Sequence, residues 1–123
     1  MRFKGVYTIV YGVKDLQKAK EWYTRIVGLS PYFDQPFYVG FNVAGYELGL
    51  NPDADPVHAQ NAGVVAYWGV DNIKQTLQKL IAECAVLHED IQDVGENIKV
   101  ASVLDQFGNV FGIIQNPHFK ENT

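Results

Sequence analysis

The chain has 123 residues, of which 47% are hydrophobic, so it is long enough for one domain with its own core and too short for two ordinary domains. Its formal net charge is −4 and its ten Lys and Arg residues are scattered, which excludes the basic face that a nucleic-acid-binding protein needs. No run approaches the ~20 apolar residues of a membrane span, and the N-terminus lacks the apolar stretch of a signal peptide. One cysteine, Cys84, allows no internal disulfide. We therefore expect a cytoplasmic protein with no nucleic-acid or membrane partner.

The first half of the chain predicts a strand, a helix and further strands. Residues 5–13 are almost all β-branched or aromatic, which is typical of a strand. Asp15 can cap a helix, apolar residues then recur at helical spacing, and Gly28 can end the helix in a left-handed conformation. Residues 37–43 and 46–50 predict strands on either side of a turn at Gly45.

The second half predicts the same order of elements. Residues 51–62, with two prolines and several turn formers, are expected to connect the halves. A strand is predicted over residues 64–70, and Asp71 is expected to cap a second helix with Cys84 on its buried stripe. Strands are then predicted around residues 85–91, 98–104 and 110–115. The sequence thus indicates a single α+β domain, residues 1–123, of two βαβββ modules with halves of about 1–52 and 62–117.

Local sequence matches support an internal duplication. The segment YGV at residues 11–13, before the first predicted helix, corresponds to WGV at residues 68–70, before the second. The segment YELGLNP at residues 46–52 ends the first half, and FGIIQNP at residues 111–117 ends the second. Two matches in the same order, within a repeated order of elements, indicate that one module has been duplicated.

Two motifs resemble those of the vicinal oxygen chelate superfamily, which contains glyoxalases, bleomycin-resistance proteins and extradiol dioxygenases. DLQKAKEWYTRIVGL at residues 15–29 resembles the family's first helix, and DQFGN at residues 105–109 is similar to its D-P-x-G-N turn. The resemblance covers nearly the whole chain. It implies a curved, cup-like mixed sheet with helices outside, a binding site inside the cup, and a homodimer.

The resemblance also implies where a metal would be held. The four ligand positions of metal-dependent members correspond to Thr8, Glu47, Val65 and Gly112. Only Glu47 has a normal metal-binding side chain, whereas a catalytic transition-metal site usually needs about three protein ligands. We therefore expect no metal at this site and no cofactor.

The alternation of strand residues predicts the lining of the cup. Thr8 shares a face with Val10, Val65 with Tyr67, and Gly112 with Ile114. The predicted ligand-binding residues are Thr8, Val10, Glu47, Val65, Tyr67, Gly112 and Ile114. The orientation of Phe33, Tyr38 and Phe41 is left open between core packing and ligand contact, because their strand register is not fixed.

These features favour a metal-independent protein, resembling glyoxalases and bleomycin-resistance proteins, that binds a small aromatic or apolar organic molecule in its cup. Glu47 is the main candidate for polar recognition, against the alternative of a solvated strand carboxylate. A second hypothesis is a lyase or isomerase acting on a small carbonyl or carboxylate compound. It would use Glu47 as catalytic general base, with Tyr67 or Thr8 as donor to the developing oxyanion. A third is a structural or regulatory protein whose cup is filled by its own side chains.

Overall fold

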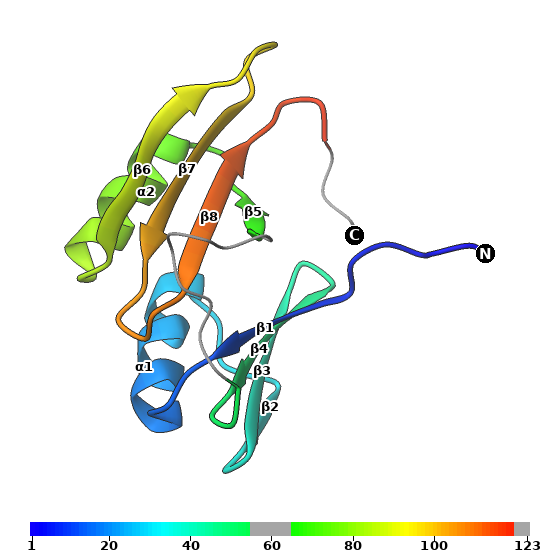
Figure 1. The fold of residues 1–123 in the computed structure, drawn as a ribbon, viewed down its shortest axis with the longest axis vertical. Coiled ribbons are helices and arrows are strands. Elements are labelled where there is room, and N and C mark those ends of the chain that lie inside the picture. The colour runs from blue at the N-terminus through cyan, green and yellow to red at the C-terminus, as the bar shows by residue number, and fades with distance from the viewer. Residues whose placement is uncertain (55–64, 120–123) are drawn as a thin grey trace. The chain divides into compact units, whose positions relative to one another are not determined.

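A computed structural model describes residues 1–54 and 65–119 of the chain (Figure 1). The described residues form two compact units, residues 1–54 and residues 65–119. Each unit has the order βαβββ and a four-stranded mixed sheet, which confirms the α+β class and the two predicted modules. Each sheet is open at both edges, and the cup that would join the two sheets stays a prediction.

The first unit places its helix on a sheet in which the first and last strands are neighbours. The strand order is β1-β4-β3-β2, with β1 parallel to β4 and the other neighbours antiparallel. The elements are β1 (Thr8–Gly12), α1 (Leu16–Val27), β2 (Phe33–Gln35), β3 (Tyr38–Val43) and β4 (Tyr46–Asn51).

Helix α1 begins and ends as its sequence predicts. The Asp15 side chain accepts a hydrogen bond from the Lys18 amide at 3.1 Å, so it caps the first turn. Gly28 ends the helix at φ 77°, a conformation that glycine adopts without steric cost. Trp22 and Tyr23 are buried, and the Tyr23 ring stacks on Tyr11 of β1 with centroids 5.8 Å apart.

The two faces of the first sheet differ in character. The helix face, which packs on α1, carries the core of the unit. Its buried strand residues are Tyr11, Val39, Phe41, Leu48 and Leu50. The opposite side is called the open face below, and it carries the alternate residues of the same strands. Burial of large apolar side chains on the helix face stabilises the unit, so the open face is free to carry other chemistry.

The second unit repeats this architecture. Its strand order is β5-β8-β7-β6, with β5 parallel to β8. The elements are β5 (Tyr67–Gly69), α2 (Ile73–Ala82), β6 (Val86–Asp93), β7 (Lys99–Leu104) and β8 (Val110–Gln115). Helix α2 packs on the sheet face that contains buried Ala101, Val103, Phe111 and Ile113. Within residues 1–54 and 65–119, neither helix is long and apolar enough to cross a membrane.

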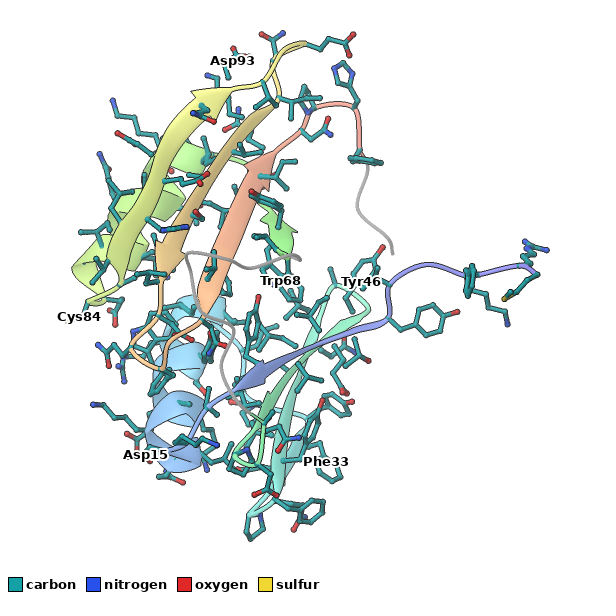
Figure 2. All side chains as sticks on the ribbon, viewed as in Figure 1. Asp15, Phe33, Tyr46, Trp68, Cys84 and Asp93 are labelled. Atoms are coloured by element: carbon teal, nitrogen blue, oxygen red, sulfur yellow. The ribbon has the colours of Figure 1, made fainter. Side chains whose placement is uncertain are left out.

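The structure corrects several details of the sequence-based prediction. A short strand, β2, precedes β3 and was not predicted separately. The cap of α2 is Asn72, whose side chain accepts from the Gln75 amide at 3.1 Å, and not Asp71. Cys84 is exposed and not buried, because α2 ends at Ala82 and Cys84 lies beyond it at φ 73° (Figure 2). Strand β5 is shorter than predicted, and the predicted connection and start of that strand include residues 55–64, which lie outside the described residues.

Candidate functional site

The open face of the first sheet is organised in rows of residues that are paired across the strands. One row crosses β1, β4 and β3 and consists of Thr8, Glu47 and Asn42. The next row lies two residues along each strand, reaches β2, and consists of Val10, Gly49, Gly40 and Phe33. A carboxylate thus lies beside a row that has two glycines at its centre.

Glu47 on β4 is held by two phenol groups. The Tyr38 hydroxyl donates a hydrogen bond to Oε2 of Glu47 at 2.6 Å, a length typical of an O–H donor on a carboxylate oxygen. The Tyr32 hydroxyl donates to the other carboxylate oxygen, Oε1. Two O–H donors match an ionised carboxylate, which can only accept. Glu47 is half-buried, and both of its oxygens are oriented by neighbours from the β2–β3 region.

The two glycines make room for these phenols. A Cβ atom on Gly49 would lie 2.6 Å from Cζ of Tyr38, closer than side-chain atoms can approach. A Cβ atom on Gly40 would lie 3.3 Å both from Cε1 of Tyr32 and from Oε1 of Glu47. The Tyr38 ring therefore crosses the glycine row and reaches Glu47 from the far side, whereas the Tyr32 ring lies against Gly40. A hydrogen bond from the Tyr32 amide to the Gly40 carbonyl at 3.0 Å holds the Tyr32 backbone next to Gly40.

Aromatic rings extend the cluster toward the sheet edge. Phe33 on β2, labelled in Figure 2, packs edge-on against Tyr38 with centroids 6.1 Å apart, and against Phe37 at 6.0 Å. These rings stay accessible: Tyr32 is 63% exposed, Phe37 62% and Phe33 37%. We call Glu47, Tyr32, Tyr38, Phe33 and Phe37 the Glu47 cluster. An accessible group of aromatic rings around an oriented carboxylate is a combination that suits recognition of a small molecule.

The charge of the cluster is not balanced within its own unit. Burial raises the pKa of the Tyr38 hydroxyl above its ordinary value, so this phenol stays protonated and neutral at pH 7. An ion pair of the first unit joins Lys20 and Asp34 at 3.0 Å. That pair lies on the helix face, since Asp34 is opposite Val39 in the register. The two open-face rows contain no lysine or arginine.

The corresponding face of the second sheet has different contents. Gly112 lies opposite Tyr67 on β5 and Ser102 on β7. A Cβ atom on Gly112 would lie 2.6 Å from the Ala66 carbonyl oxygen and 2.7 Å from Cδ1 of Tyr67. The Tyr67 ring therefore covers this position, and a longer side chain has no room there unless Tyr67 and the local backbone move.

The predicted site residues divide between the two units. Thr8, Val10 and Glu47 share the open face of the first sheet, with Thr8 directly opposite Glu47. In the second unit, Tyr67, Gly112 and Ile114 share the corresponding face. Val65 precedes β5, and Tyr67 instead occupies the register position opposite Gly112. By strand register, Tyr67 is therefore the residue of the second unit that is equivalent to Thr8 of the first. The repeated motifs instead predict Val65 as this equivalent, a difference of two residues.

The structure settles the three aromatic residues whose orientation the sequence left open. Phe33 and Tyr38 belong to the open face, whereas Phe41 points into the core and is 0% exposed. Tyr32 was missed, because a residue between Pro31 and a short strand carries no periodic signal. Strand glycines at positions 40 and 49 were the available signal, since a glycine inside a strand often marks the close approach of another group.

The residues at the family's ligand positions do not fit a metal. Thr8, Val65 and Gly112 offer one hydroxyl, one alkyl group and no side chain, and Tyr67 fills the space above Gly112. No group of three His, Cys, Asp or Glu residues that could hold a metal ion occurs in residues 1–54 or 65–119. Glu47 alone cannot supply the ligand set of a catalytic transition-metal site.

Comparison with known proteins defines the class. The family model of the Glyoxalase/Bleomycin resistance protein/Dioxygenase superfamily matches residues 5–113. The chain therefore belongs to this superfamily, which confirms the resemblance seen in the sequence. A comparison with curated proteins found no match.

Solved structures support the same fold. A glyoxalase-related enzyme from Fulvimarina pelagi is 18% identical, with 94% of this chain and 90% of that chain covered and a TM-score of 0.72. A superfamily member from Sphaerobacter thermophilus is 16% identical, with coverages of 94% and 100% and a TM-score of 0.72. TioX from Micromonospora sp. ML1 is 16% identical, with coverages of 90% and 98% and a TM-score of 0.68. At these identities the likeness shows the fold and leaves the function to the chain's own site.

Proposed function

We propose that this protein binds a small aromatic or apolar organic molecule on the open face of its first sheet, without a metal ion. The ligand would lie against the exposed rings of Tyr32, Phe33 and Phe37, with the Glu47 carboxylate as its polar anchor. Aromatic rings supply most of the contact area in such sites, and a few oriented polar groups supply specificity.

The observation that carries this proposal is the fixed geometry of Glu47. Water alone satisfies the hydrogen-bonding capacity of a solvated surface carboxylate. Glu47 instead accepts from two phenols, and two glycines leave the space that these phenols occupy. Ordering two tyrosine side chains costs conformational entropy when the protein folds. Because the binding group is then already ordered, a ligand does not bear this cost when it binds. The same arrangement supports metal independence, because the Glu47 oxygens are already engaged by Tyr38 and Tyr32.

The geometry favours binding over general-base catalysis. Both Glu47 oxygens already accept a phenol O–H, and these hydrogen bonds would become weaker if the carboxylate took a proton from a substrate and lost its charge. The lyase or isomerase hypothesis also relied on Thr8 or Tyr67 as donor, whereas the hydroxyls that reach Glu47 are those of Tyr32 and Tyr38. We therefore rank the enzyme hypothesis second.

Backbone amide NMR during titration with a library of small aromatic compounds tests the proposal. We expect shift changes in β1, β3 and β4 around Thr8, Gly40 and Gly49, together with weaker binding by Glu47→Gln. Asp34→Asn is the matched control, since it removes a carboxylate from the helix face of the same sheet. Unchanged affinity in Glu47→Gln, or shifts confined to the second unit, would refute the proposal.

We also propose that the protein functions in the cytoplasm as a homodimer, as the family resemblance implies. Light scattering coupled to gel filtration should give a mass near twice the 13.8 kDa of one chain. A mass of one chain at micromolar concentration would contradict the dimer and would leave the binding proposal untouched.

A further inference from the structure

We infer that the ligand of the Glu47 cluster is an organic cation, with an ammonium or amidinium group on an aromatic or apolar body. This inference rests on the proposed binding function and adds the charge of the ligand to it. Three features of the first unit support it: the unbalanced charge of Glu47, the ring faces beside it, and the absence of a cationic side chain from the open-face rows described above.

The first step of the argument concerns the cost of covering Glu47. An apolar ligand on this face would remove water from a half-buried carboxylate whose described hydrogen-bond donors are neutral phenols. Removing water from a charge without a compensating partner is unfavourable. A ligand with its own positive group offsets this cost, because it brings the opposite charge to the carboxylate. A neutral ligand would not offset the cost of removing water from Glu47, and an anionic ligand would in addition be repelled by the carboxylate.

The second step concerns the geometry that remains for the cation. Each phenol donates its single proton to Glu47, so its ring and the remaining oxygen lone pairs are electron-rich surfaces. The Phe33 ring packs edge-on against the rings of Tyr38 and Phe37, with centroids 6.1 and 6.0 Å away. Cations are attracted to the faces of aromatic rings, and the attraction increases when water is excluded. Rings and carboxylate thus favour the same sign of ligand charge.

The third step concerns competition from the protein itself. A lysine or arginine on the open face would neutralise Glu47 and remove the preference. The register rows hold Thr8, Val10, Asn42 and Phe33 around Glu47, and the Lys20–Asp34 ion pair is on the other face. The negative charge of Glu47 is therefore available to a ligand.

Calorimetric titration with three probes of similar size tests the inference. Phenethylammonium, phenethyl alcohol and hydrocinnamate share a phenyl group and differ in charge. We expect phenethylammonium to bind wild-type protein about 10-fold more tightly than the alcohol, with hydrocinnamate the weakest of the three. Glu47→Gln should abolish the preference for the cation, measured as the ratio of its affinity to that of the alcohol in the same variant. Asp34→Asn, which makes the same change in net charge, should keep the preference.

The outcomes separate this inference from the proposed function. Equal binding of the cation and the alcohol on the open face would overturn the inference and leave the binding function standing. Equal loss of cation binding in Glu47→Gln and Asp34→Asn would also overturn it, since the attraction would then come from net charge alone. No shift of open-face amides with any probe in a parallel NMR titration would overturn both.

Discussion

The two sheets share one strand order and differ on the faces turned away from their helices. In the first sheet, Glu47 is oriented by two phenols that pack against a glycine row. In the second, Gly112 lies beneath the ring of Tyr67 and has no space for a side chain. The two units thus share a helix-packed core while their open faces have different contents, an oriented carboxylate in one and a covered backbone in the other.

The comparison also shows that the fold does not depend on the contents of the open faces. In both units, stability comes from large apolar side chains between helix and sheet, such as Phe41 in the first unit and Ile113 in the second. Catalytic metal ligands would contribute chemistry to the open faces and little to these cores. The open faces can therefore change without unfolding the protein.

The largest expected effect is on the core of the first unit. Phe41→Ala should lower the free energy of unfolding by about 3–5 kcal/mol, because a fully buried ring is replaced by a cavity. Phe37→Ala removes the same ring from an exposed position of the Glu47 cluster and should cost less than about 0.5 kcal/mol. Urea unfolding followed by tryptophan fluorescence measures both. Similar losses in the two variants would show that the open-face rings are structural.

The next effect sharpens the contrast at Gly112. Gly112→Ala should lower the free energy of unfolding by about 1–3 kcal/mol, because its Cβ would press on the Ala66 carbonyl and on Tyr67. Gly69→Ala is the control on the neighbouring strand β5, where a Cβ atom meets nothing within 4 Å. Thermal unfolding of both variants tests this. A Gly112→Ala protein as stable as Gly69→Ala would mean that the second open face is not closed over Gly112.

A smaller effect is expected from the phenols of the Glu47 cluster. Tyr38→Phe should lower the free energy of unfolding by about 1 kcal/mol, the cost of one part-buried hydrogen bond to a carboxylate. Tyr32→Phe should cost less, because Tyr32 is mostly exposed and water can replace its hydroxyl. Chemical denaturation of the two single variants distinguishes them. A larger loss for Tyr32→Phe would reverse the assignment of Tyr38 as the principal partner of Glu47.

The smallest effect is a dependence on alkaline pH. Burial raises the pKa of Tyr38 in the folded state, so the folded state holds its proton more tightly than the unfolded state does. The contribution of Tyr38 to stability is therefore fully present below about pH 10 and is lost as pH rises through the folded-state pKa. Phenolate absorbance during an alkaline titration should show one late-titrating tyrosine that is missing in Tyr38→Phe. An unchanged titration curve in that variant would contradict this.

Much of the fold could be predicted because its signals are local. The Asp15 cap, the Gly28 stop and the alternation in β4 depend on neighbouring residues alone, and the structure agrees with each. The predicted N-cap of α2 was wrong because two adjacent residues, Asp71 and Asn72, are both good capping residues. Prediction also failed where helical periodicity continued past the real end of α2, as with Cys84.

The site could be predicted only in part. The face that Glu47 shares with Thr8 and Val10 could be predicted, because the alternation of residues along each strand fixes it. Tyr32 reaches Glu47 only through the β2–β3 hairpin, where its amide is bound to Gly40, so its role depends on contacts between residues distant in sequence. The ring of Tyr67 over Gly112 depends on the β5–β8 register, which differs by two residues from the correspondence of the repeated motifs.

The most direct test of the central claim is a calorimetric titration of chelator-treated protein with nickel, zinc, cobalt and manganese ions at neutral pH, with Glu47→Gln in parallel. We expect no binding tighter than about millimolar in either protein, because one carboxylate held by two phenols cannot replace a set of about three ligands. Binding of about one ion per chain at micromolar affinity, lost in Glu47→Gln, would contradict the account and make Glu47 part of a metal centre.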